Sequence, residues 1–120
     1  MNWSDDQPIY RQLRDKISAL ILSGVYSDKD ALPSVRQVSS DYQINHITVS
    51  KAYQELVDMG LIEARRGMGM YVLSGAKEKL HSIEKEKFIS VEVPALLTRM
   101  CQLGIDKNEL IDALMAAQGE

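Results

Sequence analysis

The sequence predicts a mainly α-helical fold with one small β-hairpin. Apolar residues recur at spacings of three and four along several segments, which is the pattern of amphipathic helices. Between two of these segments, a weakly alternating run, a Gly-rich break and a β-prone run form the pattern of a hairpin. The order of the segments predicts a winged helix-turn-helix domain followed by a two-helix C-terminal segment.

The composition limits the classes of protein that the chain can belong to. Its 120 residues fit one domain, or a small domain with an appendage, and its formal net charge is −3. Neither half is basic, so any contact with DNA has to come from a small, focused positive patch. The acidic start and the lack of a long apolar run predict neither a signal peptide nor a membrane anchor. The single cysteine, Cys101, suits a reducing compartment, and we expect a cytoplasmic protein.

The first helix is predicted from Pro8 to Ser23. Proline is tolerated at a first helical position, and Gly24 ends the pattern. The loop that follows includes Ala31-Leu32, which is a candidate for a very short strand. The helix carries one apolar stripe, formed by Ile9, Leu13, Ile17, Leu20 and Ile21.

Two further helices form the expected helix-turn-helix. The first is predicted over residues 34–41, because Ser34 followed by Gln37 is a capping-box pattern. The second is predicted over residues 45–58, with Asn45 as its N-cap. Short helices joined by a turn of three to four residues are typical of this motif.

A hairpin is predicted next, from residues 61–65 and 70–73, with Arg65-Arg66-Gly67 at its tip. A hairpin directly after the second helix of the motif is a wing. We therefore expect a winged helix-turn-helix domain over residues 1–75.

Residues 76–120 are predicted as a helical dimerisation segment. Phe88 to Val93 alone could form a strand, but a continued helix that kinks at Pro94 is favoured, since one unpaired strand is unstable. Asp106 with Glu109 begins a last helix, which is expected to direct Leu110, Ile111 and Leu114 inward. The side chains expected at the dimer interface are Leu80, Ile83, Val93, Leu97, Met100, Leu110 and Leu114.

Short motifs occur in a fixed order between residues 8 and 72. They are Pro8-Ile9-Tyr10-Arg11-Gln12-Leu13, Ile17, Ile21, Gly24, Leu32-Pro33-Ser34-Val35-Arg36, Thr48-Val49, Ala52-Tyr53, Leu56, Gly60-Leu61-Ile62 and Arg66-Gly67-Met68-Gly69-Met70-Tyr71-Val72. In this order and spacing they resemble the N-terminal DNA-binding domain of GntR-family bacterial transcription regulators. The short remainder resembles the YtrA-type subfamily, whose two C-terminal helices form the dimer.

Two stretches depart from the family pattern. Asp28-Lys29 stands where the family usually has Pro-Gly, so we expect a remodelled turn. At the start of the third helix, where many members have Arg, Thr and a second Arg, this chain has His46, Ile47 and Ser50.

The candidate DNA contacts lie in three places. The start of the third helix offers backbone N–H groups and a positive dipole end, as helix-turn-helix proteins use in the major groove. On the second helix, the resemblance directs an arginine to guanine or phosphate, with an ion pair to Asp41 as the alternative. At the wing, two arginines suit the minor groove, but they point to opposite faces of a strand, so one is expected to enter it. These residues are Arg36, Asn45, His46, Ile47, Thr48, Ser50, Lys51, Arg65, Arg66 and Gly67.

Asn45, Ile47 and Lys51 have alternative roles as well. Asn45 has helix capping as its favoured main role. Ile47 can pack on a thymine methyl group or on the second helix. Lys51 can anchor a phosphate or belong to a solvated helix face.

No motif in the sequence favours catalysis, a cofactor or a metal. His81 near Glu84 lacks a third metal ligand, and Gly67-x-Gly69 lies in a hairpin rather than between a strand and a helix. We therefore expect a non-enzymatic protein that has no cofactor and no dedicated small-molecule domain.

Two hypotheses remain. The leading one is a sequence-specific transcriptional regulator, most simply a repressor, that binds a palindromic operator as a homodimer, with a transporter operon as a family expectation. The alternative is a winged-helix protein-interaction module with weak or no specific DNA binding, which the acidic balance favours.

Overall fold

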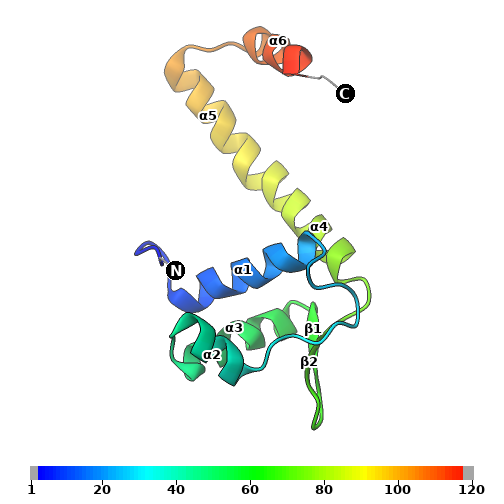
Figure 1. The fold of residues 1–120 in the computed structure, drawn as a ribbon. Coiled ribbons are helices and arrows are strands. Elements are labelled where there is room, and N and C mark those ends of the chain that lie inside the picture. Colours follow the sequence, from blue (N-terminus) through cyan, green and yellow to red (C-terminus); the bar gives the residue numbers. More distant parts are fainter. Residues whose placement is uncertain (1–2, 118–120) are drawn as a thin grey trace. The chain divides into compact units, whose positions relative to one another are not determined.

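The structure is a computed structural model, and residues 3–117 are described. They fall into two compact units, one ending at Ser82 and the other beginning at Ile83. The first unit holds three helices and a hairpin (Figure 1). Its helices are α1 (Ile9–Leu22), α2 (Val35–Tyr42) and α3 (His46–Asp58).

The helix-turn-helix forms where the sequence predicts it. Ser34 caps α2 by accepting a hydrogen bond from the backbone N–H of Gln37 at 3.0 Å. The predicted capping box is only half formed, because the Gln37 side chain donates to Asp41 at 2.8 Å instead of returning to Ser34. Gln43 adopts a left-handed conformation, with φ of 55°, and reverses the chain between α2 and α3.

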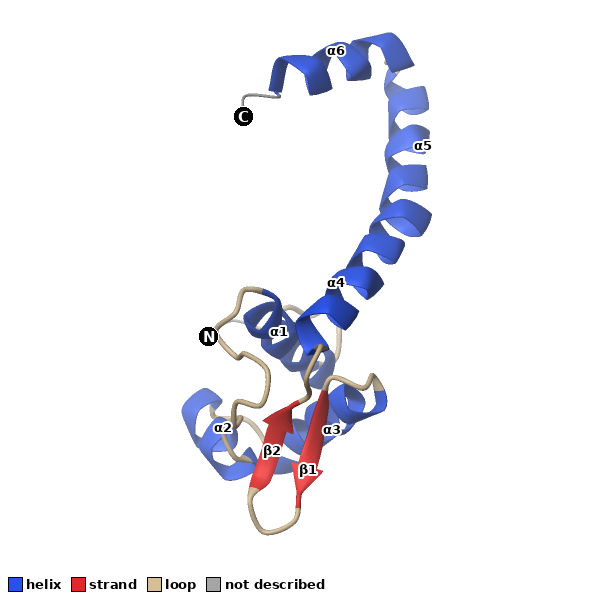
Figure 2. Cartoon of the chain, turned by 90° about the vertical axis from the view of Figure 1, so that its right-hand side faces the viewer, coloured by secondary structure: helices blue, strands red, loops and turns tan. Residues whose placement is uncertain are grey.

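The predicted wing is an antiparallel hairpin of β1 (Ile62–Arg65) and β2 (Gly69–Val72) (Figure 2). Its register places Ile62 opposite Val72 and Arg65 opposite Gly69. Ala31 forms an isolated bridge with Tyr71, so the expected short strand exists as a single pair.

The loop before α2 contains a turn in which a non-glycine residue has a positive φ. Lys29 has φ of 70°, in the left-handed region that disfavours side chains. Its N–H donates to the carbonyl of Val72 at 2.8 Å, and Val72 donates to Asp30 at 2.9 Å. These bonds to β2 hold the turn where the family usually has Pro-Gly.

The core of the first unit is formed by one face of each element. From α3 come Val49, Ala52 and Leu56, each 0% exposed, because the spacing of three and four places them on one side. The remaining buried apolar side chains of this core are Leu13, Ile17, Ile21, Leu32, Val38, Tyr53, Leu61, Ile62, Val72, Ala76 and Leu80.

The core also uses the first turns of α4 (Ala76–Lys87). Ala76 and Leu80 are both 1% exposed and belong to the core of the first unit. The packing of the winged helix-turn-helix unit therefore continues past residue 75, where the sequence places its end. The sequence places Leu80 at the dimer interface, and this prediction is wrong because the side chain is buried in the core of its own chain.

Helical structure continues beyond α4, as predicted, through η1 (Phe88–Glu92) and α5 (Val93–Leu103). The η1 segment is a π-helix, in which the N–H of Val93 bonds to the carbonyl of Phe88. Pro94 follows at once and has no N–H to give to the carbonyl four residues back, so a widened turn accommodates it. The strand considered for this stretch does not form.

The last helix, α6 (Lys107–Ala117), begins as the sequence predicts. Gly104, with φ of 70°, ends α5. Asp106 and Glu109 then exchange two hydrogen bonds, at 3.0 and 3.1 Å, so the predicted capping box is complete.

The apolar side chains of the second unit differ from expectation in two ways. Met100, expected at the dimer interface, is 7% exposed and thus already buried within one chain. Conversely Ile111 and Leu114, expected to point inward, are 49% and 61% exposed, because α6 has too little chain around it to cover them.

No single helix among residues 3–117 meets the length and hydropathy of a membrane span, although Ala76–Leu103 and Lys107–Ala117 meet them together as a bent pair.

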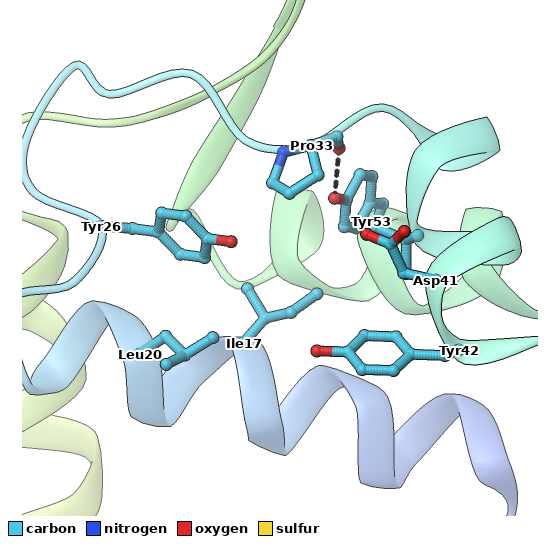
Figure 3. Close-up of a pocket in the computed structure, with 8 residues that line it drawn as sticks. Ile17, Leu20, Tyr26, Pro33, Asp41, Tyr42 and Tyr53 are labelled. Atoms are coloured by element: carbon cyan, nitrogen blue, oxygen red, sulfur yellow. Dashed lines mark hydrogen bonds between the residues drawn. The ribbon is translucent and has the colours of Figure 1, made fainter. Parts of the chain in front are cut away.

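The buried side chain of Tyr53 has a hydrogen-bond partner for its hydroxyl group. The hydroxyl of Tyr53 donates to the carbonyl of Pro33 and so ties α3 to the segment before α2 (Figure 3). Burial raises the pKa of Tyr53 well above its ordinary value, and the neighbouring Tyr26 and Tyr42 add to the shift.

We expect the free energy of unfolding to fall as the pH rises above about 10, because the unfolded chain then releases the Tyr53 proton and the folded chain keeps it. Below that pH both states hold the proton. Tyr53→Phe should flatten the decline by up to about 1.4 kcal/mol per pH unit. Urea unfolding at fixed protein concentration, with Tyr10→Phe as control, measures this. An equal slope in wild type and Tyr53→Phe would contradict it.

Candidate nucleic-acid interface

The start of α3 is capped and open to solvent. The side-chain oxygen of Asn45 accepts a hydrogen bond from the N–H of Ile47 at 2.7 Å, which confirms Asn45 as the N-cap. Its amide NH₂ remains available as a donor. The dipole of a helix of 13 residues adds partial positive charge at this end. The local geometry therefore suits a phosphate or a base edge.

The predicted readers of α3 lie on its outer surface. His46, Ser50 and Lys51 are exposed, and Thr48 is partly buried. Ile47 is 66% exposed, which is too much for a side chain packed on the second helix. An apolar group held in water at a helix start gains by meeting another apolar group, and a thymine methyl group offers one.

Lys51 is held rather than free. Its Nζ lies 4.1 Å from the centroid of the Tyr10 ring on α1, a cation–π contact. This contact limits the directions in which the ammonium group can point. Lys51 is thus neither a fully solvated side chain nor part of an ion pair among residues 3–117.

Arg36 projects from α2 and is exposed. Its alternative partner, Asp41, instead accepts a hydrogen bond from Gln37. The ion pairs within residues 3–117 join Arg14 to Asp15 and Glu55, and Arg65 to Glu63. The guanidinium of Arg36 therefore keeps its donors for an outside partner.

The two arginines of the wing have different surroundings. The guanidinium carbon of Arg65 lies 4.3 Å from the centroid of the Tyr71 ring, and its Nε lies 3.3 Å from Glu63. All three side chains share one face, because Glu63 and Arg65 are two apart and Tyr71 pairs with Glu63 across the strands. Arg66 lies in the turn and is exposed.

The tip of the wing is a tight turn. Met68 donates its N–H to the carbonyl of Arg65 at 2.8 Å, and Gly67 has φ of 75°. A turn with positive φ at its third residue is type II and needs glycine there. Gly67 thereby exposes the backbone beside Arg66, together with the side chain of Met68, which is 64% exposed.

Sequence reasoning missed the aromatic and acidic partners of the cations. In the sequence, Tyr10 stands out only as part of a motif, and Glu63 and Tyr71 only as strand residues. The alternation of the hairpin could have placed Glu63 beside Arg65, since residues two apart share a face. No local pattern links Tyr10 to Lys51, because α1 and α3 meet only in the folded chain.

Groups of three or more possible metal ligands are absent from the part of the chain that the structure describes. The candidate DNA contacts lie on the α2–α3 surface and on the wing. Both belong to the first unit.

Comparison with known proteins matches this unit. Residues 9–72 match the family described as bacterial regulatory proteins, gntR family. The HTH-type transcriptional repressor YtrA of Bacillus subtilis (strain 168) is 44% identical over 73 residues, which are 61% of this chain and 56% of YtrA.

Solved structures match as well. A GntR family transcriptional regulator from Listeria monocytogenes has a TM-score of 0.77 at 28% identity, covering 97% of this chain and 100% of the other. AraR(DBD), in complex with operator ORR3, has a TM-score of 0.55 at 25% identity and covers 60% of this chain and 87% of the other.

The winged fold and these matches define a transcriptional regulator with a DNA-binding domain. The chain belongs to the gntR family of bacterial regulatory proteins, as its motifs indicate. The relatives found are transcriptional regulators and not enzymes, and YtrA is among them.

Proposed function

We propose that the chain is a homodimeric repressor that binds a palindromic operator in the cytoplasm. The observation that supports this most is the exposed, capped start of α3, in the same unit as a wing whose tip carries Arg66. The structure of AraR(DBD) with an operator supports the use of this domain on DNA. The family resemblance adds a transporter operon as the expected target.

In this proposal, α3 reads the major groove of one half-site. Ile47 packs on a thymine methyl group, and His46 and Ser50 donate to base edges. Asn45 combines its cap with a contact through its NH₂ group. Thr48 and Lys51 bind phosphates on either side of the groove, and Tyr10 fixes the direction of Lys51.

Arg36 approaches the same half-site from α2. Its planar guanidinium presents its donors in a fixed fork and can bind a guanine edge with two hydrogen bonds. Because Arg36 forms no ion pair among residues 3–117, none has to be broken before it binds DNA.

The wing contributes through Arg66 and Gly67. Arg66 enters the minor groove, and the turn at Gly67 lets the backbone lie close to the phosphates. Arg65 is committed to Glu63 and Tyr71, so its main effect is to stiffen the hairpin. This assigns the single groove-entering arginine of the pair to Arg66.

Dimerisation rests on the exposed apolar side chains of the second unit. Leu97 and Leu114 are 56% and 61% exposed, and Ile83 is 36% exposed. Val93 and Leu110 are partly buried and flank them along the chain. Exposed apolar side chains that gather on one unit mark an interaction surface, and a second copy can cover them.

Fluorescence anisotropy with DNA from upstream of the protein's own gene tests the proposed function. We expect saturable binding that weakens steeply with salt, because each neutralised phosphate releases counterions. Binding to that DNA no tighter than to unrelated DNA, with no salt dependence, would favour the protein-interaction module instead.

We expect Arg66→Ala to weaken DNA binding about tenfold and to reduce the slope of log affinity against log salt by about one. Arg65→Ala should reduce affinity less, since Glu63 already neutralises that side chain. Lys77→Ala, an exposed cation on α4, is the matched control for the loss of one positive charge. Anisotropy at several salt concentrations measures all three. A larger loss in Arg65→Ala than in Arg66→Ala would contradict the assignment.

Leu97→Asp should weaken self-association by at least about tenfold, because it buries a charge in an apolar interface. Gln102→Asp is the control: it adds the same charge on α5, about 140° around the helix from Leu97. Sedimentation equilibrium of the full chain gives the dissociation constants. Equal self-association of the two variants would remove Leu97 from the interface.

A further inference from the structure

The first unit contains a cavity of about 90 Å³ between its three helices (Figure 3). Its walls come from α1, from the loop after α1, from the segment before α2, and from α2 and α3. The lining residues are Ile17, Leu20, Tyr26, Pro33, Val38, Asp41, Tyr42 and Tyr53.

Three tyrosines, Tyr26, Tyr42 and Tyr53, contribute phenol groups to the lining of this cavity. The hydroxyls of Tyr26 and Tyr42 point toward the same central space (Figure 3), and neither is hydrogen-bonded to another residue in the described part of the chain. The Tyr53 hydroxyl donates its hydrogen bond to the carbonyl of Pro33, so that its oxygen can still accept one. Burial, with a smaller contribution from Tyr42, raises the pKa of Tyr26, which favours its neutral phenol form.

The charged side chain that lines the cavity is the acidic Asp41. Asp41 contributes a carboxylate at the rim, and its Oδ1 accepts from Gln37, which leaves further acceptor sites. The lining contains no Lys, Arg or His. An anion would face this carboxylate with no compensating cation, whereas a cation would find the carboxylate, three phenol oxygens and aromatic rings.

The volume limits the size of the occupant. A cavity of about 150 Å³ accommodates benzene, which has six carbon atoms, and this one is smaller. The apolar walls from Ile17, Leu20 and Val38 suit a short hydrocarbon chain rather than a second polar group.

We propose that this cavity is a binding site for a short primary alkylammonium ion. The ammonium group donates to Asp41 and to the phenol oxygens, and the alkyl group lies against Ile17 and Leu20. None of the lining residues is among those assigned to DNA. The site and the proposed function therefore stand or fall separately, and the test uses no DNA.

The test is a two-dimensional ¹H–¹⁵N NMR titration of the full chain with n-propylammonium chloride. Sodium chloride at equal ionic strength is the salt control, and 1-propanol is the uncharged ligand of equal heavy-atom count. We expect saturable shifts of the backbone amides of Tyr26, Tyr42 and Tyr53 with n-propylammonium only. A saturable response equally strong with 1-propanol, or none beyond that of sodium chloride, would overturn the proposal.

Two variants locate the site. Asp41→Asn keeps the shape and an oxygen that can accept from Gln37, and it should weaken n-propylammonium binding at least about tenfold. Asp58→Asn is the matched control, because Asp58 also accepts from a glutamine four residues away, Gln54, and lies outside the cavity. Unchanged affinity in Asp41→Asn, or an equal loss in Asp58→Asn, would contradict the site. Should Asp41→Asn fail to fold, Tyr42→Phe replaces it, with an expected weakening of the same sign.

Discussion

The inner face of α3 packs against α1 and α2, and every candidate DNA contact of the helix depends on that packing. Val49, Ala52 and Leu56 are fully buried on this face. Because the face is fixed, the first turn of α3 is held outward with its cap in place. The Tyr53–Pro33 hydrogen bond adds a polar tie between α3 and the segment before α2. The reading surface is thus the outside of a helix whose inside is core.

Because the net charge of the chain is −3, DNA binding depends on which Lys and Arg side chains remain available at the surface. Contacts within the chain determine this availability. Arg14 is paired with Asp15 and Glu55, and Arg65 with Glu63, so both serve the fold. Lys51 is directed by Tyr10, whereas Arg36 and Arg66 are exposed and have no ion pair in the described residues. Local partners, more than composition, decide which cations are left for phosphate and base.

Much of the first unit could be predicted from its sequence, because periodicity and caps are local signals. The stripe of α1, the Asn45 cap and the hairpin at Gly67 all follow from residues within one or two turns. The errors lie where the tertiary structure decides. Leu80 and Met100 have the spacing of interface residues, but spacing does not say whether a side chain meets its own core or a second copy. The stacking of Arg65, the contact of Tyr10 with Lys51 and the tyrosine-lined cavity join distant segments, so no local pattern contains them.

Selection of binding sites from a random pool of double-stranded DNA tests whether the chain reads a symmetric operator as a dimer. The full chain is mixed with the pool at moderate salt, and bound DNA is sequenced over successive rounds. We expect enrichment of a two-fold symmetric site, whose half-sites each present a base pattern to α3 and whose spacing is set by the dimer. Failure to enrich any sequence, or enrichment of a single half-site without symmetry, would contradict it.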